Sequence, residues 1–225
     1  FNLCFLSIDP KIQIHWKVED GSRVKSGDKI CSLKGNTKTI VTAERAALNF
    51  LQILSATATQ TSYLVSLINS TNAKLLDTRK TIPGLRKGQK YAVKCGGGVN
   101  HRMGLYDCIM LKENHILSTG SLEQLIKNAI NQFPKTPIIV EVETLEELRL
   151  VLLMKGIKRI LCDNFSLHDL REAVKISEGI CPLEASGGIS EINIMDYART
   201  GVDYISIGSI TKDIKSIDLS LRFCS

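Results

Sequence analysis

Positively charged side chains recur in three short segments of this 225-residue chain, two of them at the ends of predicted strands and all expected at the same end of the sheet. The segments DTRKT, NHR and LKENH contribute Arg79, Lys80, His101, Arg102 and Lys112. Cations that converge on one pocket repel one another unless an anion joins them, so we expect a ligand with several negative charges. An isolated Arg79-Lys80 pair would more often be a solvated surface feature, but the recurrence at successive strand ends favours a binding site.

Carboxylates form a second set at the ends of the following predicted strands, namely Glu141, Glu143, Asp163 and Glu184. Carboxylates from neighbouring strand ends suit Mg²⁺, which prefers oxygen ligands and keeps waters for bridging to phosphates, and they could equally accept hydrogen bonds from ribose hydroxyls. Glu143 fits better at the start of the next helix, where its negative charge would interact favourably with the positive end of the helix dipole. Asp163 is therefore the stronger candidate.

Glycines follow the last two predicted strands, in Ser186-Gly187-Gly188 and at Gly208. Flexible backbone with free amides at late strand ends is typical of phosphate binding in β/α barrels. The same glycines could instead serve tight packing alone. Their occurrence at consecutive strand ends favours a phosphate clamp.

The predicted elements place all of these groups at one end of a parallel sheet. Short apolar strands alternate with amphipathic helices, such as those over residues 121–133, 144–155 and 166–177, and the strands end near Asp77, Lys112, Glu141, Asp163, Ser186 and Gly208. Candidate functional residues stand at the ends of all six strands and not at a single crevice between two of them. This arrangement predicts an incomplete β/α barrel of six or seven parallel strands. A doubly wound open sheet is the alternative.

The N-terminal part has a different pattern. Short apolar stretches separated by turn residues predict a small antiparallel sheet in the first 40 residues, followed by a helix that begins at Thr42, is interrupted over residues 55–62 and resumes through Leu67. We expect a partial α+β sandwich domain over residues 1–56 and a barrel catalytic domain over residues 57–225, whose last residues pack back on the first domain. The chain starts at Phe1, and we expect the natural protein to begin further upstream.

Composition excludes several classes of protein. The net charge of +6 is modest, and aromatic residues make up only 5% without a basic stripe among them, which argues against nucleic-acid binding. No apolar run approaches the roughly 18 residues of a membrane span. Seven cysteines without a Cys-x-x-Cys pair favour a reducing, cytoplasmic setting. The four histidines lack the spacing of a zinc site.

The segment LLDTRKTIPGLRKGQKYAVKCGGGVNHRMGLYDCIMLKENHI resembles the quinolinate phosphoribosyltransferase family. The resemblance continues through VEVETLEEL, LCDNFS, LEASGGI and GVDYISIGSIT, and backward into TAERAALNFLQ. It implies the reaction of quinolinate with 5-phosphoribosyl 1-diphosphate to give nicotinate mononucleotide, diphosphate and carbon dioxide. Members of the family also carry a helical segment before the point where this chain begins.

The resemblance also implies roles for individual residues. The quinolinate carboxylates would be held by Arg79, His101, Arg102 and Lys112, with Arg45 supplied by the partner subunit of a homodimer. The ribose, the diphosphate and Mg²⁺ would be handled by Lys80, Glu141 and Asp163, the last two as metal ligands, and the 5-phosphate would be cradled by Ser186, Gly187, Gly188 and Gly208. Lys212 stands where the family often has histidine.

Three alternatives stay open at this point. The first is a related phosphoribosyltransferase that acts on nicotinate or another anionic ring, and the second is a relative associated with molybdenum transport gene clusters. The third is a catalytically silent binding protein that has kept the barrel. The charges gathered at one rim argue against the third, because packing alone does not require them.

Overall fold

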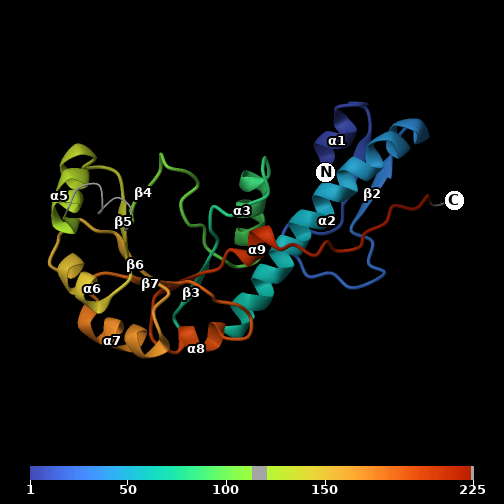
Figure 1. The fold of residues 1–225 in the computed structure, drawn as a ribbon. Coiled ribbons are helices and arrows are strands. Elements are labelled where there is room, and N and C mark those ends of the chain that lie inside the picture. The colour runs from blue at the N-terminus through green and yellow to red at the C-terminus, as the bar shows by residue number, and fades with distance from the viewer. Residues whose placement is uncertain (113–120, 224–225) are drawn as a thin grey trace.

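The computed structural model describes residues 1–112 and 121–223, which form a small N-terminal region and a β/α barrel connected by one long helix (Figure 1). In the N-terminal region, α1 (Asn2–Leu6) precedes the antiparallel pair β1 (Gln13–Trp16) and β2 (Cys31–Lys34). The predicted small antiparallel sheet is therefore confirmed. Phe5 and Ile12 pack against the first turns of the long helix in a separate small core.

The long helix α2 (Thr37–Leu67) corrects two predictions. It begins five residues earlier than expected, because the side chain of Asn36 caps it by accepting hydrogen bonds from the backbone of Lys38 and Thr39. It also continues through the segment expected to interrupt it. The hydroxyls of Thr57 and Thr61 donate to the carbonyl oxygens four residues earlier, at 3.1 and 2.7 Å, so these polar side chains are satisfied within the helix. The expected domain boundary at residues 56 and 57 falls inside α2.

All six predicted strands of the barrel are present, and they form one parallel sheet. They are β3 (Lys74–Leu76), β4 (Ile109–Leu111), β5 (Ile138–Val142), β6 (Arg159–Asp163), β7 (Leu183–Ser186) and β8 (Tyr204–Ser206). Their order is β3-β8-β7-β6-β5-β4, so the first strand pairs with the last. A doubly wound sheet reverses its strand order in the middle, whereas this cyclic order is that of a barrel opened between β3 and β4.

The open side of the barrel is partly filled by the segment before the second cationic motif. Val99 forms an isolated parallel bridge with Leu76, and its backbone N–H donates to the carbonyl of Leu75 at 2.8 Å. Asp77 N–H donates to the carbonyl of Val99 in turn. This segment takes the position of a seventh strand, so the prediction of an incomplete barrel with six or seven strands is confirmed.

Helices surround the strands and bury the main core between the two layers (Figure 1). They are α3 (Arg86–Cys95), α5 (Leu122–Gln132), α6 (Leu145–Leu152), α7 (Leu167–Ser177), α8 (Ile194–Ala198) and α9 (Ser209–Lys212). The three helices predicted between strands are confirmed, each capped by a side chain, from Ser121, Thr144 and Ser166. In the described ranges, no helix has both the length and the apolar character needed to cross a membrane.

The C-terminal segment returns along α2 toward the N-terminal region (Figure 1). Ile217 N–H donates to the carbonyl of Gln52 at 3.4 Å, and the Gln52 side chain donates to the carbonyl of Leu219 at 3.3 Å. Leu221 packs against the small N-terminal core. The two ends of the chain therefore share contacts with the same stretch of α2.

Gly96 sets how closely α3 approaches α2 and gives a test of this packing. A methyl group there would overlap the carbonyl oxygen of Ala58 and lie 2.7 Å from Cβ of Thr61. We expect Gly96→Ala to lower the free energy of unfolding by about 1–3 kcal/mol because the backbone must move, as measured by urea denaturation.

Gly88 on the same helix provides the control for this substitution. A methyl group at Gly88 would meet only the flexible end of Leu54, at 3.3 Å. Alanine in a helix interior gains about 0.5–1 kcal/mol over glycine, so Gly88→Ala should be neutral or stabilising. Equal urea midpoints for the two variants would contradict the packing assigned to Gly96.

Candidate active site

The loop after β3 is held from several sides by its backbone. Thr78 Oγ1 accepts from Lys80 N–H at 3.0 Å, and the carbonyl of Lys80 accepts from the hydroxyl of Thr211 at 2.7 Å. The buried side chain of Gln89 accepts from Ile82 N–H at 2.8 Å and donates to the carbonyl of Thr211 at 2.6 Å. The loop is therefore fixed against both α3 and α9, although the side chain of Lys80 is exposed.

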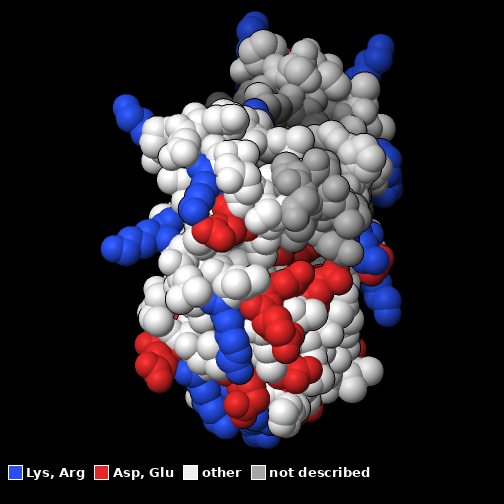
Figure 2. All heavy atoms as spheres, turned by 60° about the vertical axis from the view of Figure 1, so that its left-hand side comes forward, with Lys and Arg blue, Asp and Glu red and all other residues white. Residues whose placement is uncertain are grey.

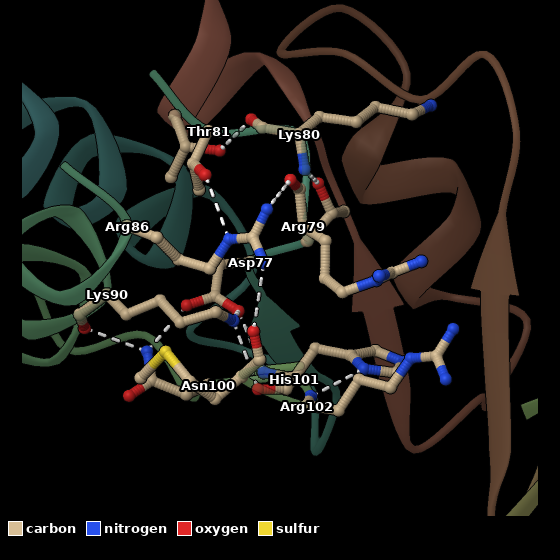
Figure 3. A network of polar contacts seen from close by, with 12 residues as sticks. Asp77, Arg79, Lys80, Thr81, Arg86, Lys90, Asn100, His101 and Arg102 are labelled. Atoms are coloured by element: carbon tan, nitrogen blue, oxygen red, sulfur yellow. Dashed lines mark hydrogen bonds and ion pairs between the residues drawn. The ribbon is translucent and has the colours of Figure 1, made fainter. Parts of the chain in front are cut away.

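The predicted cations do gather on one side of this loop. Figure 3 shows the side chains of Arg79, Lys80 and Arg102 extending in the same direction, away from the hydrogen-bonded network behind them. The pKa of Arg102 is lowered by partial burial and by the positive charge of nearby Arg79. Gly208 lies against the stem of Lys80, since a methyl group there would be 3.1 Å from Cδ of that lysine. The cationic motif after β3 and the glycine after β8 therefore meet at one rim.

A buried carboxylate, Asp77, ties the two cationic segments together. Its oxygens accept hydrogen bonds from Lys90 Nζ, from Asn100 Nδ2 at 2.5 Å and from the backbone N–H of His101 at 2.8 Å. Burial raises the pKa of Asp77 and lowers that of Lys90, while their mutual attraction opposes both shifts. Lys90 also donates to the carbonyl of His101 at 3.0 Å. The end of β3 is thus joined to residues 100–101 by a fully enclosed ion pair.

Arg102 lies over the second strand of the barrel. Its guanidinium donates to the carbonyl of Cys108 at 3.1 Å and contacts the sulfur of Met110 at 3.6 Å. Cys108 and Met110 belong to a small apolar cluster with Ile139 and Leu161, separate from the core beneath the helices. Arg102 therefore covers the inner side of the barrel, with part of its guanidinium accessible.

His101 differs from the other predicted quinolinate ligands because it is 8% exposed and both of its ring nitrogens face the protein. Nδ1 accepts the backbone N–H of Arg102 at 2.7 Å, and Nε2 lies 3.4 Å from Oε2 of Glu184. An accepting Nδ1 places the proton on Nε2. The ring of His101 therefore fixes the backbone of Arg102 through this hydrogen bond.

Glu184 is not a rim carboxylate, which corrects its inclusion in the acidic set. It is fully buried, and its Oε2 lies 2.7 Å from Nε of Arg159, whose guanidinium stacks over the ring of Tyr204. Burial raises the pKa of Glu184, but His101 and Arg159 outweigh that effect and the pKa falls below its ordinary value. Because side chains alternate along a strand, Glu184 lies one layer deeper in the barrel than Ser186.

Glu141 and Asp163 lie on adjacent strands. Glu141 is in register with Leu161 and Asp163 with Ser186, so both carboxylates share a face, with Asp163 nearer the carboxyl edge of the sheet. Asp163 accepts a hydrogen bond from the side chain of Asn164 at 2.9 Å. The acidic and cationic sets are in direct contact, because Lys112 Nζ lies 2.5 Å from Oε2 of Glu141.

These two carboxylates fit a magnesium ion that is completed by a substrate. Mg²⁺ is usually held by one or two protein carboxylates together with water and phosphate oxygens. Within the described ranges, no group of three or more His, Cys, Asp or Glu side chains is arranged to hold a metal by itself. Glu141 and Asp163 would therefore hold the ion jointly with a phosphorylated ligand.

The glycine pair after β7 requires a conformation that other residues rarely adopt. Gly187 has φ +99° and Gly188 has φ +61°. A methyl group on Gly187 would also overlap Oδ1 of Asn164, whose N–H donates to the carbonyl of Ser186 at 2.9 Å. The backbone of this turn therefore packs directly on the residue after Asp163. The turn follows β7, which pairs with β8, and Gly208 comes two residues after the end of β8.

Arg45 and Lys212 are not brought into this network. Arg45 is exposed on the N-terminal half of α2, which extends away from the barrel (Figure 1). Lys212 ends α9 with an exposed side chain, 3.6 Å from a carboxylate oxygen of Asp213. Within one subunit, the described contacts do not assign either residue to the cationic cluster.

Charge is distributed differently away from the rim. Figure 2 shows the face that carries α5 and α6, where Asp and Glu side chains gather and Lys and Arg side chains surround them. Lys127 pairs with Glu123 along α5 at 2.5 Å, and both side chains are exposed. Exposed pairs of this kind contribute little to stability.

Two family models match the chain almost end to end. Residues 2–55 match the N-terminal domain of quinolinate phosphoribosyl transferase, and residues 57–222 match its C-terminal domain. The chain belongs to the quinolinate phosphoribosyltransferase family.

Individual relatives agree with this assignment. The chain is 40% identical to the nicotinate-nucleotide pyrophosphorylase (carboxylating) of Mycobacterium leprae, over 93% of this chain and 74% of that protein. It is 39% identical to quinolinate phosphoribosyltransferase (decarboxylating) 2b of Nicotiana tabacum, over 98% of this chain and 67% of that protein. The solved structure of the nicotinate-nucleotide pyrophosphorylase from Francisella tularensis superposes with a TM-score of 0.95 at 48% identity, over 97% of this chain and 78% of that one.

Sequence reasoning missed the residues that hold this family's cationic segments in place. They are Asp77, Gln89, Lys90 and Thr211, and Asn164 plays the corresponding part for the glycine turn after β7. In the sequence, Asp77 stands out only as the end of a predicted strand. Nothing in the mostly polar sequence of α3 marks Lys90 as buried, and only its contact with Asp77 explains how the charge is tolerated there.

The buried ion pair can be tested by a double-mutant cycle in this quinolinate phosphoribosyltransferase-family chain. Removing one partner of a buried pair costs about 3–5 kcal/mol because the other charge is left uncompensated. We therefore expect Asp77→Asn and Lys90→Met each to lower the free energy of unfolding by that amount, measured by urea denaturation. The double variant should lose clearly less than the sum of the two single losses. Additive losses would show that the pair is not coupled.

Proposed function

We propose that this chain transfers the phosphoribosyl group of 5-phosphoribosyl 1-diphosphate to quinolinate, giving nicotinate mononucleotide, diphosphate and carbon dioxide in de novo NAD biosynthesis. The observation that carries the proposal is the rim itself. Arg79, Lys80 and Arg102 extend to one side of a fixed network, in a chain that belongs to the quinolinate phosphoribosyltransferase family. Glu141 and Asp163 lie at the ends of neighbouring strands of the same barrel.

The cationic side of the rim would bind the two carboxylates of quinolinate. Arg79 and Arg102 supply planar donors that match carboxylate geometry. Lys112 adds a third charge, and its ion pair with Glu141 would place this acid at the edge of the quinolinate site. His101 would act mainly through Arg102, whose backbone N–H its ring accepts.

The glycine side of the rim would bind the phosphoribosyl donor. The backbone at Ser186, Gly187, Gly188 and Gly208 would receive the 5-phosphate, and Lys80, which packs over Gly208, would reach the diphosphate. Glu141 and Asp163 would hold Mg²⁺ on the donor. When bound, this ion neutralises charge on the diphosphate and so makes it a better leaving group.

The reaction then follows from charge. The bond between ribose C1 and the diphosphate oxygen breaks with its electron pair on oxygen, where Lys80 stabilises the developing negative charge. Glu141 or Asp163 stabilises the positive charge that develops on C1. The pyridine nitrogen donates its lone pair to C1, and the cationic ring then stabilises the electron pair left on the ring carbon when the adjacent carboxylate leaves as carbon dioxide. A proton from solvent then bonds to that carbon and completes nicotinate mononucleotide. The protein mainly orients the two reactants.

The predicted homodimer belongs to this proposal. Arg45 would reach a neighbouring subunit's rim, which agrees with its exposure on α2 outside its own barrel. Leu3, Val41 and Phe50 on α1 and α2 are 80%, 55% and 43% exposed, and a partner subunit would cover them. The cytoplasmic setting expected from the cysteines stays a prediction.

A direct assay tests the function. Purified protein with 5-phosphoribosyl 1-diphosphate and Mg²⁺ should consume quinolinate and release diphosphate and carbon dioxide in equal amounts. Nicotinate offered under the same conditions should react far more slowly, because it leaves one set of cations without a carboxylate. Turnover of nicotinate alone would favour the related phosphoribosyltransferase, and no turnover of either ring would favour a silent binding protein or the molybdenum-associated relative.

Arg102→Leu tests the quinolinate side of the rim. We expect quinolinate affinity to fall roughly 10- to 100-fold, the value of one charged hydrogen-bonding contact, while donor affinity changes little. Titration calorimetry measures both. Arg149→Leu, which removes an exposed arginine from α6, is the matched control and should bind quinolinate normally. Unchanged quinolinate affinity in Arg102→Leu would exclude the assigned role.

Asp163→Asn tests the donor side. The substitution keeps the shape of the side chain but removes the charge that would hold Mg²⁺. We expect kcat/KM for the donor to fall by roughly tenfold or more and the Mg²⁺ concentration for half-maximal rate to rise. Asp196→Asn, at an exposed position of α8, serves as the control. Normal dependence on both donor and Mg²⁺ in Asp163→Asn would rule the metal role out.

A further inference from the structure

The two cationic segments of the rim have a second connection besides the buried pair of Asp77 and Lys90. Arg86 is the first residue of α3 and lies between the loop after β3 and the segment that follows Arg102 (Figure 3). We propose that Arg86 is a positioning residue that sets the distance between Arg79 and Arg102, and thereby the fit of the rim to a pyridine dicarboxylate. This inference rests on the proposed function.

All three nitrogens of the Arg86 guanidinium are used for this connection. Nε donates to Oγ1 of Thr81 at 3.0 Å, and Nη2 donates to the carbonyl oxygen of Arg79 at 3.1 Å. Nη1 donates to the carbonyl oxygen of Met103 at 3.2 Å. Two of the contacts hold the first cationic loop and the third holds the segment that carries Arg102. A planar fork with fixed donors can bridge these acceptors, whereas the single ammonium of lysine cannot.

The position of Met103 makes the third contact relevant to Arg102. Met103 N–H and Gly104 N–H donate to the carboxylate of Asp107 at 2.7 and 3.1 Å, which closes a tight turn directly after Arg102. A shift of the Met103 carbonyl therefore moves the turn together with the backbone of Arg102. The first loop responds in the same way, because Arg86 binds the carbonyl of Arg79 itself.

Electrostatics explains why such a connection is needed. Arg79 and Arg102 carry like charges, and without a ligand their repulsion favours separation of the two segments. The buried pair of Asp77 and Lys90 joins the segments behind the rim. Arg86 adds a second connection through backbone carbonyls, so it opposes this separation without neutralising the cations that bind the substrate.

The test compares Arg86→Ala, Arg86→Lys and wild type, with Lys87→Ala on the exposed side of α3 as the matched control. Quinolinate affinity is measured by titration calorimetry, with and without guanidinium at non-denaturing concentration. We expect both Arg86 variants to bind quinolinate roughly 10- to 100-fold more weakly. Guanidinium should restore a measurable part of the affinity in Arg86→Ala and none in Arg86→Lys, whose side chain occupies the site. Lys87→Ala should match wild type.

Two results would overturn the proposal. One is wild-type quinolinate affinity in a folded Arg86→Ala, and the other is weak binding that guanidinium does not restore, which indicates a general loss of structure. If Arg86→Ala does not fold, the test rests on Arg86→Lys. Normal quinolinate affinity in that variant would show that only the positive charge at this position matters, and it would overturn the proposal. Failure of wild type to bind or turn over quinolinate would instead refute the proposed function, and calorimetry on wild type separates the two cases.

Discussion

The buried carboxylate of Asp77 fixes the position at which the two main cationic segments meet. It accepts hydrogen bonds from Lys90, Asn100 and the backbone of His101, and no water reaches the pair. A charge in such a place is stable only with its partners. Because the carboxylate follows β3 directly, this requirement connects the first strand of the barrel to the segment that fills its open side. The cations at the rim depend on that connection.

Beneath the rim, a second set of buried charges supports the same residues. Glu184 lies between His101 and Arg159 at the level of Tyr204, one layer below the strand end. The contact of this carboxylate with Arg159 acts through charge. His101 in turn accepts a hydrogen bond from the backbone N–H of Arg102, so the position of Arg102 depends on the buried ring. The interior of the barrel thus combines these buried charges with a small apolar cluster beneath Arg102, whereas the core beneath the helices is apolar.

Local regularities in the sequence predicted most of the fold. Short apolar strands, amphipathic helices and capping residues such as Ser166 depend on neighbours close in the chain, so pattern alone located them. The prediction failed within α2, where Thr57 and Thr61 looked like a break. Their hydroxyls are satisfied by the preceding turn and packed by the barrel, and this packing comes from residues far away in the sequence. Propensity is a weak guide where tertiary contacts decide.

The sequence by itself determined which chemical groups stand at the strand ends, because strand periodicity and the family motifs are patterns of residues close together in the chain. It could not determine how those groups pair. The Lys112–Glu141 contact, the depth of Glu184 and the bridging position of Arg86 all join residues from separate strands or loops. Such pairings depend on the register and closure of the barrel. Only the tertiary structure fixes these, since closure brings β3 beside β8 although most of the barrel separates them in sequence.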